Sequence, residues 1–284
     1  GDTERGIFIT DSNTVHNSPY LRVLGKRSDG NTHQSFSGRI LLASLRTDAK
    51  VNSGRKVGVI MFGGNHTNTS ESNILYAASI AGIAGDSFDS ATDMHTDLAF
   101  YTGNTGRAPN TNNVSSGDER LRIKSTGAVT MPYQVAFFAH CNIGNHDLSA
   151  GDKFQFNILT SSGKAAVNSN HHTFNGTAVF NTSTNAFTAP VAGLYQFTVT
   201  VYYRRTGDPL SILVPRVNNG EVSNGNNTVF FLGSNDITDG NTESGTLYLQ
   251  LDANDVVTVH RRTGQTGTAR YYGPHSHFCG HLIG

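Results

Sequence analysis

The chain has 284 residues and no formal net charge, because 21 basic side chains balance 21 acidic ones. No block of either sign stands out along the sequence, which argues against nucleic-acid binding, and no apolar run approaches the roughly 20 residues needed to cross a bilayer as a helix. Only 15% of the residues are charged, while Gly, Asn, Thr and Ser are abundant, a mixture typical of short strands joined by turns.

The first part of the chain is predicted to be rich in β-structure. Residues 74–85 are apolar nearly all round and carry several β-branched side chains, which favours a buried strand or strand pair over an amphipathic helix. In the segment 119–129, Leu121 and Ile123 alternate with cationic residues. Because successive side chains of a strand point to opposite faces, we predict that the Leu121 and Ile123 face is buried and the cationic face is wet.

A domain boundary is predicted near Met131, Pro132 and Tyr133. Proline removes a backbone donor from a strand ladder, and a new apolar run, VAFFAHC, begins directly after it. We therefore divide the chain into a stem or shoulder domain, 1–131, and a second domain, 132–284. Gly1 is expected to mark a processing boundary within a longer protein.

The second domain shows apolar alternation at the spacing of a β-sandwich. The expected strands cover residues 135–141, 178–181, 193–203, 211–217, 228–233, 245–251, 255–261 and 275–283. Short strands at this spacing predict an all-β jelly roll or sandwich. Tyr195 and Phe197 share one face of their strand by period two and are expected to lie in its core.

The stretch NGTAVFNTSTNAFTAPVAGLYQFTVTVYY resembles the signature of the C1q globular domain, a member of the C1q and tumour-necrosis-factor superfamily. The matching residues are Asn175, Phe180, Phe187, Gly193, Tyr195 and Phe197. The closing segment FCGHLI is similar to the last strand of that family, with Phe278, Gly280, Leu282 and Ile283 in place. The resemblance implies a ten-stranded jelly roll that forms a tight homotrimer through the sheet carrying its first and last strands.

The first 131 residues resemble a segment common in bacteriophage tail-fibre and tail-spike proteins. Three strand patterns occur there in order: A-x-I-x-G at 81–85, L-x-F-x-T at 98–102 and E-R-x-R-I-x-x-x-G-x-V at 119–129. This resemblance implies an extracellular virion appendage whose C-terminal tip contacts the host, together with other tail proteins as partners.

A cluster of carboxylates is the best candidate for catalysis. Asp86, Asp89, Asp93 and Asp97 lie within DSFDSATDMHTD, and a glycosidase needs two carboxylates about 5 to 10 Å apart. Such clusters are more often solvated turns, and the segment is too short for the long β-helix of a tail-spike depolymerase. We therefore predict a protein without enzymatic activity.

A loop in the second domain is a candidate calcium site. Asp236, Asp239 and Glu243 stand among Asn residues and backbone oxygens in SNDITDGNTESG, a mixture of oxygen ligands that Ca²⁺ prefers. The competing interpretation is a solvated hairpin loop.

Aromatic and cationic loop residues are candidates for contact with a receptor, because they can stack on sugars or pair with acidic groups. The candidates are Tyr202, Tyr203, Arg204, Arg261, Arg262, Arg270, Tyr271 and Tyr272. The competing interpretation is that these side chains pack loops or a subunit interface.

The last strand carries a row of potential transition-metal ligands. At period two, His275, His277, Cys279 and His281 are predicted to share one face, opposite Phe278 and Leu282. In a trimer, three copies of one His-x-His pair would supply six imidazoles on the threefold axis. The alternative is a row of small polar residues at the interface. Cys141 is expected near Cys279, with both thiols free rather than disulfide-bonded.

Together these observations predict a trimeric virion tail-fibre protein that attaches to a host-surface receptor, expected to be a carbohydrate, by multivalent contact. The alternatives are a secreted C1q-like lectin or scaffold of cellular origin and a capsule-degrading depolymerase.

Overall fold

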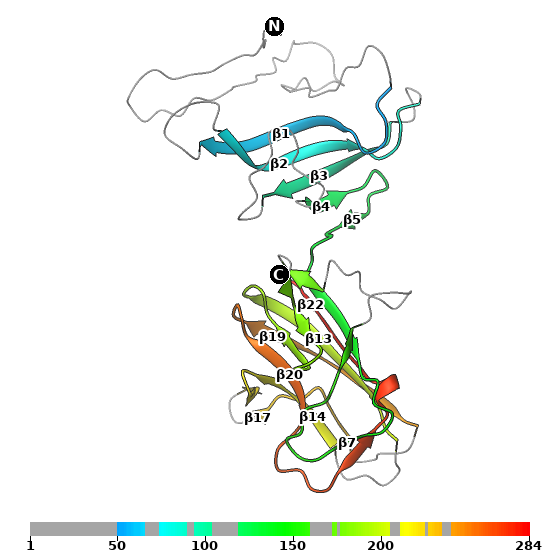
Figure 1. The fold of residues 1–284 in the computed structure, drawn as a ribbon, viewed down its shortest axis with the longest axis vertical. Coiled ribbons are helices and arrows are strands. Elements are labelled where there is room, and N and C mark those ends of the chain that lie inside the picture. The colour runs from blue at the N-terminus through cyan, green and yellow to red at the C-terminus, as the bar shows by residue number, and fades with distance from the viewer. Residues whose placement is uncertain are drawn as a thin grey trace, which may run out of the picture.

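The computed structural model describes residues 50–65, 74–89, 94–103, 119–159, 172–174, 177–204, 211–224, 227–234 and 240–284. In this part of the chain the regular structure consists of strands and a single 3₁₀ turn, which confirms the all-β prediction. The strands form an N-terminal sheet and a C-terminal sandwich (Figure 1).

The N-terminal sheet is antiparallel and follows chain order. Its strands are β1 (Lys56–Asn65), β2 (Ile74–Ala84), β3 (Thr96–Thr102), β4 (Glu119–Ile123) and β5 (Val129–Thr130). The predicted strand at 119–129 is a hairpin of β4 and β5, closed by a hydrogen bond from Lys124 N–H to the Ala128 carbonyl (2.8 Å). Gly127 provides the positive φ of 84° that this turn requires.

The prediction that the Leu121 and Ile123 face of β4 is buried was wrong. Ile123 is 38% exposed, and Arg122 instead lies beside Ala99, on the buried face of β3. A register shift opposite Phe100 and Tyr101 brings Glu119 to the same face as Arg122. Ion pairs with Glu119 and Asp97 compensate for the desolvation of Arg122. The face of β4 that carries Glu119 and Arg122 is therefore the inner face of the sheet.

Residues 131–135 connect β5 to β6, the first strand of the sandwich, and are held from both sides. The Arg120 guanidinium of β4 lies 5.1 Å from the centre of the Tyr133 ring. The Gln134 side-chain amide donates to the Leu282 carbonyl, and Leu282 N–H donates to the Val135 carbonyl (3.0 Å). The predicted domain boundary falls in this short connection and stays a prediction.

The C-terminal unit consists of two main sheets. The first has the order β19-β13-β22-β6-β8, and the second has the order β11-β12-β20-β14-β15, with β18 also paired to β14. The first sheet comprises β6 (Ala136–His140), β8 (Ile158–Leu159), β13 (Gly193–Tyr202), β19 (Thr242–Leu251) and β22 (His277–Leu282). The second comprises β11 (Phe180–Asn181), β12 (Ala186–Thr188), β14 (Ser211–Val217), β15 (Gly220–Glu221), β18 (Leu232–Ser234) and β20 (Val256–Arg261).

Three two-stranded pairs and one turn complete the described part of the unit. They are β9 (Thr173–Phe174) with β10 (Thr177–Ala178), β16 (Ser223–Asn224) with β17 (Asn227–Thr228), β7 (His146–Leu148) with β21 (Ala269–Tyr271), and the 3₁₀ turn η3 (Gly273–His275). The first and last strands, β6 and β22, are neighbours in one sheet, which is the arrangement that the sequence resemblance implies.

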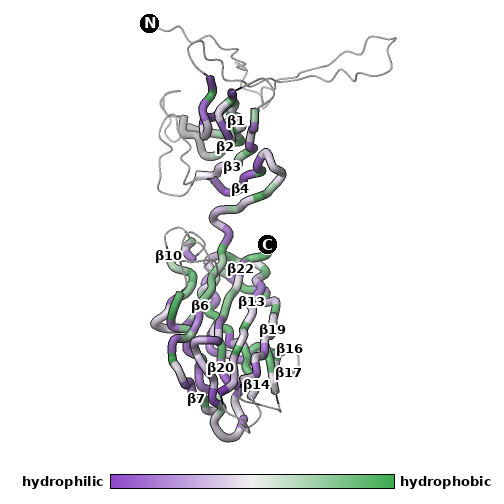
Figure 2. Tube along the Cα trace, turned by 90° about the vertical axis from the view of Figure 1, so that its right-hand side faces the viewer, coloured by the Kyte–Doolittle hydropathy of each residue, from purple (hydrophilic) through white to green (hydrophobic). Residues whose placement is uncertain are grey.

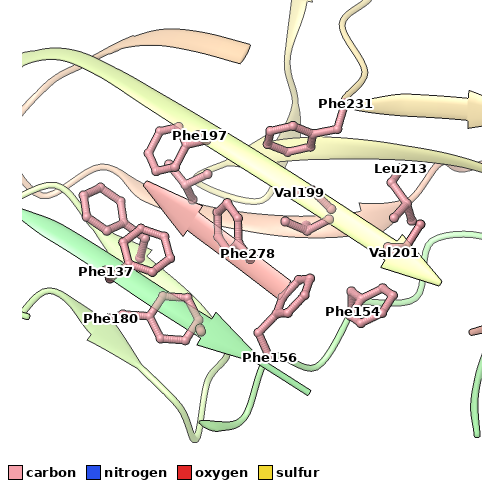
Figure 3. Close-up of a cluster of buried hydrophobic side chains, with 14 of the residues drawn as sticks. Phe137, Phe154, Phe156, Phe180, Phe197, Val199, Val201, Leu213, Phe231 and Phe278 are labelled. Atoms are coloured by element: carbon pink, nitrogen blue, oxygen red, sulfur yellow. The ribbon is translucent and has the colours of Figure 1, made fainter. Parts of the chain in front are cut away.

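Aromatic side chains fill the core between the two sheets (Figure 3). Residues of β13 alternate between buried and half-buried, so Tyr195 and Phe197 point inward as predicted. Phe137 is central: its ring stacks on Phe180 (4.8 Å) and meets Phe278 edge-on (5.0 Å). Burial of such rings makes a rigid scaffold on which loops can be presented.

The strand register defines two ends of the sandwich. Leu282 pairs with Tyr195 near the connection to the N-terminal sheet, whereas His277 pairs with Thr200 near the other end of β13. Tyr202, the last residue of β13, therefore lies at the end remote from the connection. We call this remote end, with the loops after β13, β20 and β21, the distal end (Figure 1).

Candidate binding site

A cluster of three rings and one cation lies at the distal end. Tyr202 ends β13, Tyr272 follows β21, and His275 ends η3. The ring centres are 6.0 Å apart for Tyr202 and Tyr272, 5.1 Å for Tyr202 and His275, and 4.9 Å for Tyr272 and His275, all with edge-to-face geometry. The Arg204 guanidinium lies 5.1 Å from the centre of the Tyr272 ring. We call these four residues the distal cluster.

Backbone hydrogen bonds fix the two segments of the distal cluster together. Tyr272 N–H donates to the Tyr202 carbonyl (2.8 Å), and Arg204 N–H donates to the Arg270 carbonyl (3.1 Å). The buried Ser276 hydroxyl donates to the Tyr272 carbonyl (2.9 Å) and accepts from Tyr202 N–H (3.2 Å). The rings are thus positioned before any ligand arrives, which lowers the entropic cost of binding.

The distal cluster presents chemistry suited to flat or weakly polar ligands. Arg204 and His275 are exposed and the two tyrosines are half-buried, so ring surface and a cation face solvent together. Such groups stack on sugar or aromatic faces and attract acidic substituents. Sequence reasoning named both tyrosines and Arg204 as contact residues but assigned His275 to a different role.

Three other predicted contact residues are interior side chains and do not reach a ligand. Tyr203, Tyr271 and Arg261 have no exposed surface. The Arg261 guanidinium donates to the carbonyls of Leu148 (3.0 Å), Thr266 (2.9 Å) and Gly267, and so holds two distal loops. The sequence predicts exposed side chains here, because cationic and aromatic residues stand in a loop-like segment. Arg261 is buried instead, since the carbonyls of Leu148, Thr266 and Gly267 need a hydrogen-bond donor.

The remaining predicted arginines differ in availability. Arg270 of β21 forms a bidentate ion pair with Asp147 of the adjacent strand β7 (2.7 and 2.8 Å). Arg262 borders a surface pocket of about 400 Å³, which the sequence did not predict and which is lined by Ile212, Arg262, Thr263, Gly264, Gln265 and Thr266. Arg262 therefore stays a candidate for contact with a receptor, in addition to the distal cluster.

The predicted calcium loop is only partly described. Asp236 and Asp239 lie outside the described residues. Glu243 lies within strand β19, half-buried, and its carboxylate accepts a hydrogen bond from the Tyr203 hydroxyl (3.1 Å). Burial, the neighbouring Tyr271 and this carboxylate raise the pKa of Tyr203, so the hydroxyl stays a donor. Glu243 thus has a structural role in the single chain.

The predicted row of histidines is shorter than expected. His275 lies in η3 rather than on the last strand, because Gly273, Pro274 and His275 form a 3₁₀ turn and β22 begins only at His277. His277, Cys279 and His281 do lie on the face of β22 turned away from the core. In the described part of the chain, no group of three or more His, Cys, Asp or Glu side chains is arranged to hold a metal ion.

A histidine that sequence reasoning missed lies beside this row. His140 of β6 pairs directly with His277 of β22, and the His277 ring stacks on Phe138 (5.0 Å). Burial and the neighbouring His140 lower the pKa of His277, which keeps its imidazole neutral and able to act as a ligand or acceptor. The signal in the sequence was the alternation of VAFFAHC, which puts Phe138 and His140 on one face.

The two cysteines are free, as predicted, but lie on opposite faces of their sheet. Cys141 follows β6 on the core side and is fully buried, whereas Cys279 pairs with Thr198 and Phe138 on the outer side. Burial raises the pKa of both thiols, so neither is activated as a nucleophile.

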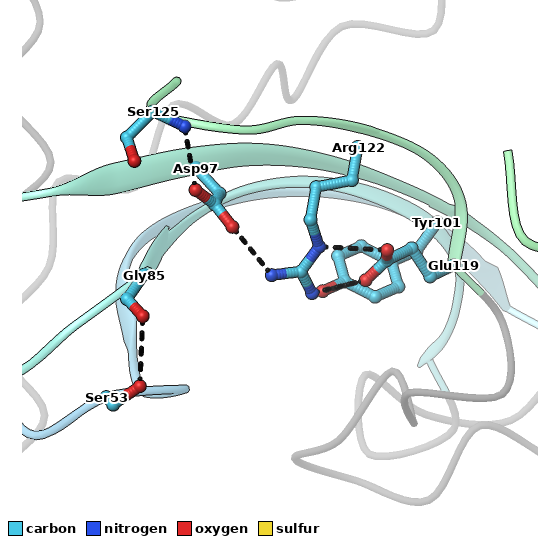
Figure 4. A network of polar contacts seen from close by, with 7 residues as sticks. All are labelled: Ser53, Gly85, Asp97, Tyr101, Glu119, Arg122 and Ser125. Atoms are coloured by element: carbon cyan, nitrogen blue, oxygen red, sulfur yellow. Dashed lines mark hydrogen bonds and ion pairs between the residues drawn. The ribbon is translucent and has the colours of Figure 1, made fainter. Parts of the chain in front are cut away.

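Two carboxylates of the predicted catalytic cluster, Asp97 and Asp89, form ion pairs, while Asp86 is exposed. Figure 4 shows the contacts of Asp97. Asp97 accepts hydrogen bonds from Arg122 (3.1 Å) and from Ser125 N–H (2.9 Å). Burial acts to raise the pKa of Asp97, but these two donors outweigh it and hold the pKa below its ordinary value. Asp89 pairs with Lys50, and Asp93 lies outside the described residues. A general acid of a glycosidase needs the opposite shift, so Asp97 does not fit that role.

The comparison with protein families matches part of the C-terminal unit. Residues 153–283 match the family model described as the C1q domain. Among the solved structures that the chain matches is the Eiger TNF of S. frugiperda, at 16% identity over 53% of this chain and 93% of that chain, with a TM-score of 0.38. Another is the globular domain of zebrafish complement 1qA protein, at 19% identity over 53% and 98% of the two chains, with a TM-score of 0.35. No curated protein matches the sequence. In the described residues, no helix is long and apolar enough to cross a membrane.

Proposed function

We propose that this chain, whose residues 153–283 match the C1q domain, is the receptor-binding part of a trimeric bacteriophage tail fibre or related virion appendage. Domains of the C1q and TNF type are typically trimeric binding modules. In this proposal the C-terminal unit is the head, and it attaches to a carbohydrate on the host surface without a catalytic step. The distal cluster is the observation that carries the assignment of the contact site.

The outer face of the first sheet of the head supports the trimer. The residues of β6, β13, β19 and β22 on this face include no Asp, Glu, Lys or Arg. They include Phe138, His140, Gln196, Thr198, Thr200, Ser244, Thr246, Tyr248, His277, Cys279 and His281. Around a threefold axis the same residues of each copy approach one another, so a charged face would repel itself. An uncharged face allows three copies to meet.

The strand patterns of the N-terminal sheet support the placement on a virion. The three patterns that resemble tail-fibre proteins lie on β2, β3 and the β4–β5 hairpin, which are consecutive neighbours in the sheet. Other tail proteins are the partners that this placement implies.

The position of the distal cluster suits attachment. It lies at the end of the head remote from the N-terminal sheet, where a fibre tip would meet a surface. Three copies in a trimer, and several trimers on one particle, convert weak contacts with sugars into firm attachment.

The test is binding of the intact chain to host cells and to immobilised lipopolysaccharides and capsular polysaccharides. We expect Tyr202→Ala and Tyr272→Ala each to weaken binding about tenfold or more, as loss of an aromatic anchor does, while sedimentation still reports a trimer. Phe230→Ala is the control, because Phe230 is an aromatic side chain that is 51% exposed and outside the distal cluster.

Unchanged binding by both tyrosine variants would remove the distal cluster from the proposal. Release of new reducing ends from a polysaccharide would contradict the non-enzymatic head and favour a depolymerase. A monomer at micromolar concentration would contradict the trimer.

A further inference from the structure

The N-terminal sheet has its polar network on the inner face and apolar side chains on the outer one. Pairing across the five strands puts nine apolar residues on the outer face, which we call the apolar face: Ile60, Phe62, Ala78, Ile80, Leu98, Phe100, Leu121, Ile123 and Val129. Two glycines, Gly58 and Gly82, and two threonines, Thr96 and Thr102, share that face towards its edges. In register, Ile60 and Phe100 both flank Ile80, and Leu98 lies opposite Ile123. None of the nine side chains carries a charge or a hydrogen-bonding group.

Much of this apolar face is open to solvent in the single chain. The exposed fractions are 49% for Ile60, 53% for Phe62, 41% for Leu98, 38% for Ile123 and 56% for Val129. These residues come from β1, β3, β4 and β5, so the exposed surface runs across the sheet. Figure 2 shows these strands coloured by the hydropathy of each residue. Single exposed apolar residues are ordinary, but a contiguous patch that spans several strands marks an interaction surface.

The inner face alone gives the N-terminal sheet little support. The core cluster of its described residues contains Ala81, Ile83, Ala99 and Tyr101, and two of these four are alanines. Beside it, Arg122 is paired with Asp97 and Glu119, an arrangement that contributes little net stability once desolvation is counted. Covering the apolar face would therefore add hydrophobic stabilisation that these described inner-face residues do not supply.

We infer that the apolar face of one chain packs against the apolar faces of neighbouring copies, so that the N-terminal sheets form a second intersubunit core. A symmetric assembly brings identical residues together, and an uncharged apolar surface is complementary to itself. This inference rests on the proposed trimer of the head, since three joined heads hold their N-terminal sheets at high effective concentration.

The connection between the two units favours a neighbouring copy of the chain, rather than an unrelated protein, as the partner of the apolar face. Only residues 131–135 separate β5 from β6, and they are fixed by Tyr133 against Arg120 and by Gln134 against Leu282. A short connection fixed by these contacts keeps each N-terminal sheet close to its own head. Trimerisation of the heads therefore brings the three sheets close to the same axis.

Chemical cross-linking tests the contact directly. In a Cys279→Ser background of the full chain, Leu98→Cys places a thiol on the apolar face, while the native Cys141 is fully buried. A bismaleimide with a spacer of about 10 Å matches the distance between packed sheets. We expect covalent dimers of the Leu98→Cys variant on a denaturing gel. Met61→Cys is the control, because Met61 is 39% exposed but lies on the inner face, opposite Ser79.

Hydrogen exchange gives a second readout. Ile60→Asp puts a charge on the apolar face, whereas Met61→Asp puts it on the adjacent residue of the same strand. In an isolated chain both side chains are substantially exposed, so both variants should behave alike. In the inferred assembly, Ile60→Asp should speed exchange of the β1–β3 amides about tenfold or more, and Met61→Asp should change it much less.

The outcomes separate this inference from the proposed function. A trimer in which Leu98→Cys gives no covalent dimers and Ile60→Asp behaves like Met61→Asp overturns the second core and leaves the trimeric head intact. A monomeric full chain overturns both. Cross-linking of the Met61→Cys variant as efficiently as the Leu98→Cys variant would also overturn the inference, because the contact would then not select one face.

Discussion

His140 and His277 lie directly opposite each other on the neighbouring antiparallel strands β6 and β22, on the face of the sheet turned away from the core. His281 lies farther along the same face of β22, opposite Ala136. A single chain therefore offers a pair of imidazoles, and only an assembly of three chains would multiply that pair into a complete coordination sphere. The face that carries this pair is the one proposed to form the trimer.

The hypothesis of a transition metal on the threefold axis predicts a metal that depends on His277. Elemental analysis of the intact chain should find the metal at about one ion per three chains, from six imidazoles in octahedral geometry. His277→Ala should abolish it, and His95→Ala, a change in an exposed histidine of the N-terminal unit, should not. An intact trimer without metal would leave His140 and His277 as interface packing residues.

Stability should fall in mild acid because buried histidines resist protonation. Burial lowers the pKa of His146 and of His260 below the ordinary 6.5, although nearby Asp147 and Asp152 partly oppose this for His146. The His146 Nε2 atom also accepts a hydrogen bond from Gln155 N–H (3.2 Å), which requires an unprotonated nitrogen. Below about pH 6.5 the unfolded chain binds more protons than the folded one, so the free energy of unfolding decreases as pH falls.

The measurement is the melting temperature of the head between pH 7.5 and 5. His146→Asn should reduce the dependence of the melting temperature on pH, although it also lowers the melting temperature at neutral pH. His95→Asn serves as the control, because His95 is exposed. A melting temperature that rises on acidification would contradict the assignment.

Gly280→Ala should destabilise the head. An added Cβ would lie 2.5 Å from Cδ1 of Phe197 and 2.9 Å from Cε1 of Phe137, two rings that are themselves fully buried. Such overpacking costs about 1–3 kcal/mol in the free energy of unfolding, measurable by denaturant titration. Gly144→Ala is the matched control, because no atom lies within 4 Å of its added Cβ. Equal stability of the two variants would show that the aromatic core is loosely packed.

Asp97→Asn should destabilise the N-terminal sheet without changing attachment. It leaves Arg122 with one carboxylate instead of two and weakens the acceptor for Ser125 N–H. Loss of one partner from this partly buried ion pair should cost about 1–3 kcal/mol in the free energy of unfolding. Asp86→Asn changes an exposed carboxylate of the same cluster and should have little effect. If Asp97→Asn instead abolished a polysaccharide-cleaving activity, the carboxylate cluster would be catalytic.

The sequence was sufficient for the local level of the fold. Alternation along β13 predicted that Tyr195 and Phe197 point inward. Turn residues bounded the longer predicted strands, such as 193–203, 211–217 and 255–261, close to their observed ends, while short strands such as β7, β12 and β21 were not predicted. Strand periodicity is a property of the backbone, so it can be read wherever apolar and polar residues alternate. The residues that resemble the C1q domain predicted the fold of the C-terminal unit. Several of them are the aromatic residues of its core, and another is Gly280, so they determine how the two sheets pack.

The choice of faces and the composition of the site depended on tertiary structure. Alternation in β4 shows two faces but not which one meets the interior. The ion pairs of Arg122 with Asp97 of the neighbouring strand β3 and with Glu119 of β4 itself accompany the choice of the inner face. In the sequence Tyr203 and Arg261 resemble exposed loop residues, but both are buried. The Tyr203 hydroxyl donates a hydrogen bond to Glu243, and the Arg261 guanidinium donates to a loop carbonyl. Tyr202, Tyr272 and His275 come from two segments about 70 residues apart, and only the pairing of distant strands brings them into one cluster, because hydrogen-bonded register is fixed between strands and not within them.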